Sequence, residues 1–165
     1  MSVALTITFD DLGVTSGLRR MQARADDLRP VLADIGAELE SSTVKRFVTN
    51  VAPDGVPWPP SARAKEKPLT RTLVLTGDLR DSIHYVVESD AVEVGSALVY
   101  AGIHQVGGTI TAKGKALAFT LFNGAFVMTK SVTIPARPYL GMSANDNATV
   151  LDIVGQHMAR AAVGG

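Results

Sequence analysis

The chain has 165 residues, 46% of them hydrophobic and 5% aromatic, and its 16 basic residues balance its 16 acidic ones. A net charge of zero provides no overall attraction to nucleic acid or anionic lipid, and it permits close association between copies of the chain. Because there is no cysteine, disulfides, thiolate nucleophiles and zinc–thiolate sites are excluded.

The length predicts one domain over residues 1–165, large enough to bury most of the surface of its unfolded chain. No internal repeat or linker divides it. The first residues lack a basic region followed by an apolar run, and no apolar stretch reaches the roughly 18 residues of a membrane span. We therefore expect synthesis in the cytoplasm and no membrane partner.

The N-terminal third predicts a strand followed by two helical segments. Residues 3–9 alternate apolar and small polar side chains, which is the period of a strand with one buried face. Residues 15–28 suit a first helix, and Pro30 suits the first turn of a second. The second helix carries an apolar stripe of Leu28, Leu32, Ile35, Leu39, Thr43 and Phe47. We assign Asp34, Glu38, Lys45 and Arg46 to its polar side.

The middle of the chain predicts a long loop and then short elements. Prolines recur through residues 50–68 and Asp54-Gly55 is a turn dipeptide, so we expect no regular structure there and a loop anchored by Trp58. A short helical turn is expected after Thr76-Gly77-Asp78. Residues 84–88 and 91–95 are predicted to form two strands.

The C-terminal part predicts a hairpin and a final helix. Residues 117–122 and 126–133 flank Asn123-Gly124, a strong hairpin signal. Ser143 and Asp146 resemble a capping box before a helical apolar face, on which His157 would be partly buried. The whole pattern predicts an α+β fold, with N-terminal helices and a C-terminal helix packed on a mainly antiparallel sheet.

No pattern supports a catalytic, cofactor or metal site. Residues 108–115 superficially resemble a phosphate loop, but the spacing is wrong and Ala116 replaces the magnesium-binding hydroxyl, so we expect a hairpin loop. The three histidines lack the spacing that brings two imidazoles onto one metal. Ser82, His84 and the nearby aspartates supply the residue types of a triad, but no nucleophile elbow frames Ser82.

A series of short blocks, in chain order, carries a family resemblance. The blocks are Asp54-Gly55, Trp58-Pro59, residues 75–80, Ser82-Ile83, residues 94–96, residues 100–107 and residues 134–141. In this order, over about residues 28–153, the sequence resembles the phage virion morphogenesis family, which includes the tail completion proteins of Mu-like phages.

The resemblance implies a structural protein rather than an enzyme. It implies that the protein joins a finished tail to the head, as a ring at the head-proximal end of the tail, and sixfold symmetry is the natural expectation. The implied partners are other copies of the chain, tail tube or tail terminator proteins and head connector or neck proteins. We expect synthesis in the host bacterial cytoplasm and a place in the virion. The alternatives are a soluble tail-assembly factor absent from the virion and a small hydrolytic enzyme.

The resemblance also singles out ten motif residues with scaffolding roles: Trp58, Gly77, Leu79, Gly95, Tyr100, His104, Gly107, Pro135, Arg137 and Pro138. We expect Trp58 and Tyr100 to be packed anchors. Arg137 should clamp a carboxylate or backbone carbonyls, and His104 should be packed and hydrogen-bonded to a carbonyl.

The glycine-rich entry at Gly107, followed by β-branched and basic residues, predicts a second kind of site. We expect an extended, mobile assembly arm formed by Thr109, Ile110, Thr111, Lys113 and Lys115. The alternative is a solvated turn without a partner.

Overall fold

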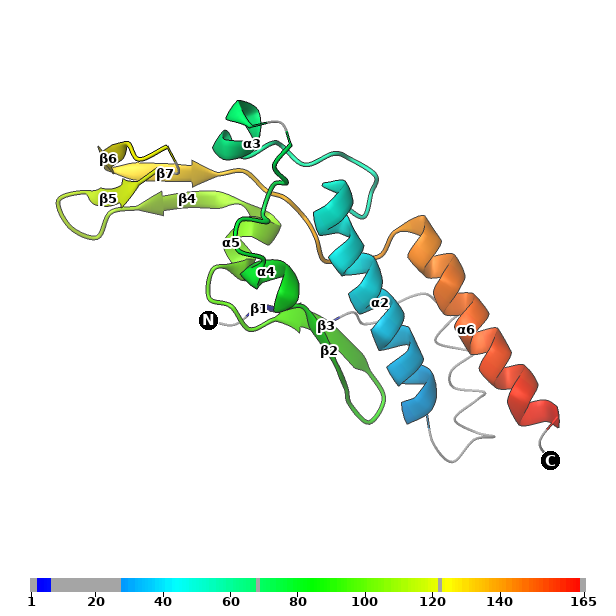
Figure 1. Cartoon of the computed structure of the whole chain (residues 1–165). Helices are drawn as coiled ribbons and strands as arrows, with labels where there is room; N and C mark the ends of the chain where they lie inside the picture. Colours follow the sequence, from blue (N-terminus) through cyan, green and yellow to red (C-terminus); the bar gives the residue numbers. More distant parts are fainter. Residues whose placement is uncertain (1–2, 7–27, 68, 122, 164–165) are drawn as a thin grey trace.

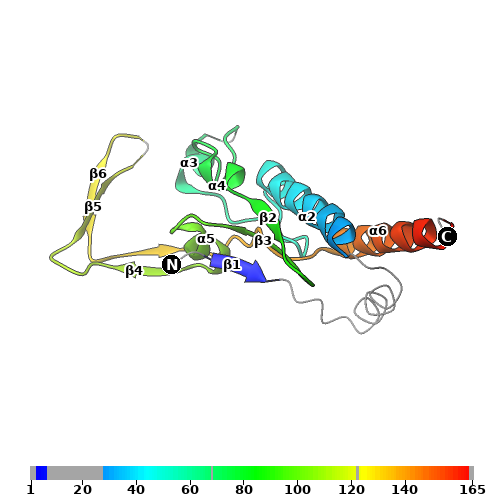
Figure 2. The ribbon, with the colours of Figure 1, turned by 90° about the horizontal axis from the view of Figure 1, so that it is seen from below.

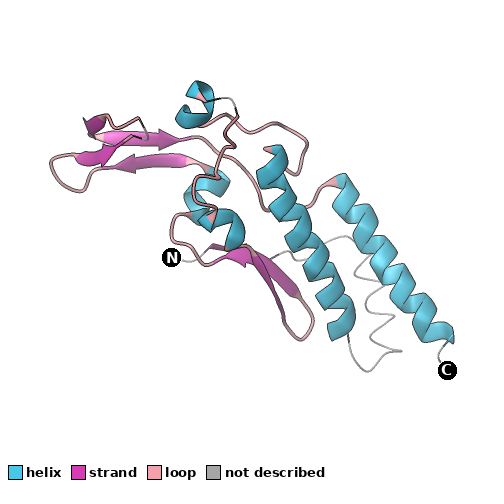
Figure 3. Cartoon of the chain, in the orientation of Figure 1, coloured by secondary structure: helices cyan, strands magenta, loops and turns pink. Residues whose placement is uncertain are grey.

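The computed structural model describes residues 3–6, 28–67, 69–121 and 123–163. Within them the fold is α+β, as predicted: two long helices lie on one side of a small antiparallel sheet, and paired strands project from the other end of the molecule (Figures 1 and 3). The helix expected over residues 15–28 and the end of the first strand lie outside the described residues, except Leu28.

The sheet consists of β1 (Val3–Thr6), β2 (His84–Val87) and β3 (Val92–Ser96), in the order β1-β3-β2 with antiparallel neighbours. In the central strand β3, every second side chain is buried, so one face points to the core. The two strands expected after residue 83 are confirmed to within a residue at each end.

Helix α2 (Arg29–Thr49) packs between the sheet and the C-terminal helix. Its predicted stripe is confirmed, since Leu32, Ile35 and Phe47 are almost completely buried. Arg46, however, was wrongly assigned to the polar side: it is only 6% exposed. Its position three residues after Thr43 places it on the buried face of the helix.

The proline-rich segment is a loop, with Trp58 buried as predicted. The expectation that no regular structure occurs in residues 50–68 is wrong for its end, which forms the short helix α3 (Ala62–Glu66). The reason is local: no proline interrupts residues 62–66, and the Ser61 hydroxyl accepts a hydrogen bond from the Ala64 amide at 3.1 Å.

Two further short helices follow. Helix α4 (Asp78–Asp81) begins after Gly77, whose φ of 101° favours glycine, and this is the helical turn predicted there. Helix α5 (Ala101–Val106) was not predicted as a helix, and its residues were named only within the motif block 100–107. The core beneath these elements contains Tyr139, Phe47, Trp58 and aliphatic side chains.

Helix α6 (Ala144–Val163) lies against α2 (Figure 1). The predicted capping box is confirmed, because the Asp146 amide donates to the Ser143 hydroxyl at 3.1 Å and the Ser143 amide donates to Asp146 at 2.7 Å. His157, partly buried as expected, contacts Asp34 of α2 at 2.7 Å.

The projecting part contains β4 (Gly108–Thr111), β5 (Leu117–Thr120), β6 (Phe126–Thr129) and β7 (Ser131–Ile134). The Asn123-Gly124 hairpin is confirmed as the β5–β6 pair. Two expectations are wrong: residues 108–111 are a strand rather than a loop, and residues 126–133 are two strands separated at Lys130. Both differences arise from the pairing of β4 with β7, which the local sequence does not reveal.

Candidate assembly interface

The four strands β4–β7 form a single projection, which we call the β arm and define as residues 108–134. None of its described residues is buried. The β4–β7 pair leads away from the body, and the β5–β6 hairpin then turns sharply from that line (Figure 2). A two-stranded ribbon of this kind is marginally stable in water by itself, so the β arm is the candidate for an interface.

The inner half of the β arm has two chemically different faces. In the β4–β7 register, Ile110 pairs with Val132, and Ile134 lies on the same face. On the opposite face Thr109 pairs with Thr133, and their hydroxyls are 3.1 Å apart. One face therefore suits apolar contacts and the other suits hydrogen bonds.

The outer half is apolar on both faces. Leu117, Phe119 and Val127 share one face, while Phe126 and Met128 on the other are 66% and 65% exposed. The hairpin turn itself is well formed, with Gly124 at a φ of 86° and the Ala125 amide donating to the Asn123 side chain at 3.0 Å. The apolar side chains of the first face are partly buried and those of the second are exposed. Exposed apolar side chains gathered in this way are typical of a surface that is buried in an assembly.

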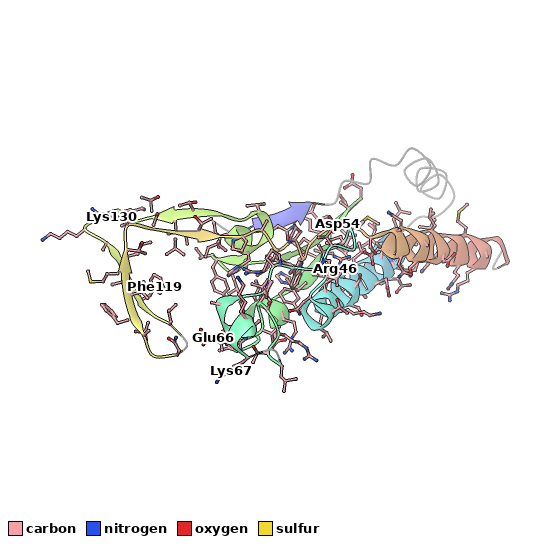
Figure 4. All side chains as sticks on the ribbon, turned by 90° about the horizontal axis from the view of Figure 1, so that it is seen from above. Arg46, Asp54, Glu66, Lys67, Phe119 and Lys130 are labelled. Carbon is pink, nitrogen blue, oxygen red and sulfur yellow. The ribbon has the colours of Figure 1, made fainter. Side chains whose placement is uncertain are left out.

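The bend between the two halves carries all the charge of the β arm. Residues 112–116 lie opposite Lys130, whose carbonyl accepts from the Ala112 amide at 2.9 Å. Lys113, Lys115 and Lys130 are exposed, and no other residue of the β arm is charged. Figure 4 shows Lys130 at the corner of the bend and Phe119 on the outer hairpin.

The root of the β arm is held by α5 and the segment that follows β7. Gly107 has a φ of 71°, and a Cβ there would lie 2.6 Å from the Ala136 amide nitrogen, so only glycine fits. Gln105 accepts from the Tyr139 and Leu140 amides at 2.9 and 3.0 Å. The Arg137 amide donates to the His104 carbonyl at 2.8 Å. These bonds give the flexible ribbon a rigid base.

A cavity of about 380 Å³ lies beside this root, lined by Arg63, Leu73, Leu79, Tyr100, His104 and Arg137 among others. The buried His104 Nδ1 has no hydrogen-bond partner among the described residues, so this nitrogen does not form the expected bond to a carbonyl. Burial, followed by the charge of Arg137, lowers the pKa of His104, which keeps the imidazole neutral at pH 7. Among the described residues, no group of three His, Asp or Glu side chains is arranged to hold a metal ion.

Comparison with known proteins identifies the chain's relatives. The model of the phage virion morphogenesis family matches residues 9–159. The chain belongs to this family. It is also similar to the protein described as "Putative capsid assembly protein G" of Escherichia phage Mu, with 28% identity over 92% of this chain and 96% of that protein. No solved structure matches the chain.

This virion morphogenesis protein therefore has a structural or assembly role in building phage particles. The family expected from the ordered blocks is confirmed. No helix in the described part of the chain has the length and apolar character needed to cross a membrane.

Several of the predicted motif residues meet around the root. The Trp58 indole N–H donates to the Pro138 carbonyl at 2.8 Å, and Arg137, 6% exposed, donates through Nε to the Pro59 carbonyl at 2.7 Å. Arg137 is thus a clamp on a carbonyl, as expected. Pro135 follows β7 directly.

The other motif residues lie toward the body. Leu79 is buried in α4, Gly77 precedes it, and Gly95 lies in the central strand opposite His84. The expectation that Tyr100 is a packed anchor is wrong, because its side chain is 43% exposed and meets only the edge of His104. The tyrosine that anchors the core is Tyr139, whose hydroxyl donates to the Ala101 carbonyl at 2.9 Å.

The sequence analysis missed a buried charged network that supports the root from below. Arg46 forms an ion pair with Asp146, and it donates to the Tyr139 and Gly141 carbonyls at 2.7 and 2.9 Å. The Ser42 hydroxyl donates to the same carboxylate. The spacing of Arg46 within the stripe of α2 was the signal that could have revealed it.

Proposed function

We propose that this protein completes the phage tail and joins it to the head, as a closed ring of six copies. One side of the ring would contact tail tube or tail terminator proteins, and the other would contact head connector or neck proteins. The protein would then be retained in the virion at the neck. The observation that carries the proposal is the β arm, an apolar and basic projection whose described residues are all unburied.

The geometry of the β arm supports a ring. It is a long projection on one side of the molecule, so it contacts a different surface on its partner from the one it leaves. Contacts between different surfaces are heterologous, and repeating one of them generates a closed ring when the rotation closes and an open filament when it does not. The net charge of zero permits this close association between copies.

Ser82, His84 and the nearby aspartates have the residue types of a hydrolase triad, but their hydrogen bonds fit a structural role better. The Ser82 hydroxyl donates to the Leu79 carbonyl at 2.8 Å, and His84 Nδ1 lies 3.0 Å from the Ser82 carbonyl rather than from its hydroxyl. Asp81 pairs with Arg80. A nucleophile–base–carboxylate chain needs hydrogen bonds between these groups, and they bond to other partners instead.

A second candidate is an assembly factor that is not retained in the virion. The name of the Mu relative, which refers to capsid assembly, favours it. Mass spectrometry of purified virions distinguishes the two: several copies of the chain per particle are expected for a neck ring, and none for a transient factor.

The test of the proposal removes the β arm. Residues 109–133 are replaced by Asn-Gly, because Gly108 and Ile134 are paired and a two-residue turn can join them. We expect a folded protein by circular dichroism, no ring in native mass spectrometry, and unjoined heads and tails in a complementation assay. Thr109→Ser, which keeps the hydroxyl on the same face, serves as the control. Normal particle yield from the folded, armless protein would contradict the proposal.

A further inference from the structure

The charges of the chain are divided unequally between the β arm and the rest. The β arm holds three lysines and no acidic residue. Since those are three of 16 basic residues, 13 remain elsewhere against all 16 acidic ones. The β arm is therefore complementary in charge to the remainder of a second copy.

The acidic residues best placed to receive it lie at the turn between β2 and β3. Glu88 and Asp90 are both exposed there, next to Val86, which is 50% exposed. Three other carboxylates are already engaged: Asp34 contacts His157, Asp81 pairs with Arg80, and Asp146 pairs with Arg46. No ion pair joins Glu88 or Asp90 to a described cation of its own chain.

The positions of the two surfaces suit a contact between copies. The β2–β3 turn points away from the sheet on the side opposite to the β arm (Figures 1 and 2). The β arm points away from the turn of its own chain, and it would have to abandon the direction set by the β4–β7 pair to reach that turn. A second copy placed head to tail can present its turn to the bend of the β arm.

We propose that the three lysines of the β arm, with the apolar side chains beside them, bind the Glu88–Asp90 turn of the neighbouring copy. This inference rests on the proposed ring, for which it supplies the contact between subunits. Lys113, Lys115 and Lys130 supply the cations, and the exposed Phe126 and Met128 supply apolar area beside Val86. The occupant of the β arm is a second copy of this chain, not a tail protein.

The first test uses cross-linking, which is clean because the chain has no cysteine. Lys115→Cys protein is mixed with size-tagged Asp90→Cys protein under mild oxidation. We expect a covalent heterodimer as the main product. The matched control pairs Lys115→Cys with Glu66→Cys, an exposed acidic position on α3. This pair should give at least tenfold less covalent heterodimer. Equal yields from the two pairs would overturn the inference.

The second test exchanges the charges. Substitution of all three lysines by glutamate should weaken self-association at least tenfold, measured by sedimentation velocity, with unchanged circular dichroism. Mixing this protein with the Glu88→Lys/Asp90→Lys variant should restore association, because each new cation then meets a new carboxylate. Failure of the mixture to associate, with both variants folded, would contradict the proposed contact.

The two proposals fail in different ways. If the protein forms rings but the Lys115→Cys and Asp90→Cys proteins do not cross-link, the contact is wrong and the ring remains supported. If these two proteins cross-link but phage lacking this chain still join heads to tails, the contact stands and the proposed function is wrong.

Discussion

The ion pair of Arg46 and Asp146 is the residue-scale feature with the largest expected energy. Side-chain exposure is 8% for the arginine and 1% for the aspartate, so both charges are removed from water. The cost of desolvation is offset because Arg46 also donates to two carbonyls and Asp146 also accepts from Ser42 and Ser143. The pair fixes how the end of α2 meets the start of α6.

We expect Asp146→Ala to lower the free energy of unfolding by about 3 kcal/mol or more, because it leaves the Arg46 charge buried without its partner. Urea denaturation measures this. The control is the double variant Arg46→Met/Asp146→Leu, which removes both charges and should lose much less than the sum of the single substitutions. Additive losses would show that the two side chains act independently.

The same ion pair makes the stability of the folded protein depend on pH. Burial alone would raise the pKa of Asp146, but hydrogen bonds from Ser42 and Ser143 and the charge of Arg46 lower it below its ordinary 3.8. A lowered pKa stabilises the folded state above the pKa of the unfolded chain, and this stabilisation is lost as the pH falls through the folded value. Between about pH 5 and pH 3, the wild-type protein should lose more stability than the double variant. Parallel curves of unfolding free energy against pH for the two proteins would contradict this.

Trp58 links the proline-rich loop to the segment that follows the β arm. It is 5% exposed, meets the Phe47 ring edge-on at 5.5 Å, and donates to the Pro138 carbonyl. Trp58→Ala should cost about 3 kcal/mol or more in thermal and urea unfolding. Trp58→Phe retains most of the packing but loses the hydrogen bond, which should lower the free energy of unfolding by about 1 kcal/mol. An unchanged melting temperature for the alanine variant would rule out the anchoring role.

At the scale of elements, α2 approaches the sheet through a single glycine. A Cβ at Gly36 would lie 2.4 Å from Cδ2 of Tyr85 and 2.8 Å from Cγ2 of Val92. Gly36→Ala should therefore destabilise the protein by about 1–3 kcal/mol, despite the better helix propensity of alanine. Gly155→Ala in α6 is the matched control: it meets no atom within 4 Å and should be neutral or stabilising. Equal effects at the two sites would refute the close packing.

The elements that depend on local sequence were predictable. Pro30 and the apolar stripe defined α2, Ser143 and Asp146 defined the start of α6, and Asn123-Gly124 defined the β5–β6 turn. These signals work because each is created by residues close together in the chain.

What could not be predicted depends on contacts between distant residues. The pairing of β4 with β7 joins residues that are 20 to 26 positions apart, and it divides a strand-like run at Lys130. Arg46 resembles a surface residue until Asp146, a hundred positions later, is placed beside it. The residues of the candidate site were therefore predicted, namely the lysines and the glycine-rich root. Its structure, a ribbon of paired strands, was not.

At the scale of the whole molecule, the separation of basic β arm and acidic body makes assembly sensitive to salt. The Debye length falls from about 10 Å at 0.1 M to about 3 Å at 1 M, so contacts between exposed charges weaken. We expect high salt to reduce self-association of the wild type, measured by sedimentation. The weak association of the triple lysine-to-glutamate variant should instead rise with salt, because salt screens the repulsion between its glutamates and the acidic turn. Stronger association of the wild type at high salt would show that the apolar side chains dominate the contact.

The distribution of aromatic residues also determines which part of the molecule contributes to the fluorescence signal. Trp58 and all three tyrosines lie outside the β arm, whose aromatic residues are phenylalanines. Because tryptophan and tyrosine dominate ultraviolet emission, a fluorescence melting curve follows the body of the protein and does not detect the ribbon. Fraying and docking of the β arm would leave that signal almost unchanged. Amide hydrogen exchange along residues 108–134 would detect both, since each paired backbone N–H exchanges only when its own ladder opens.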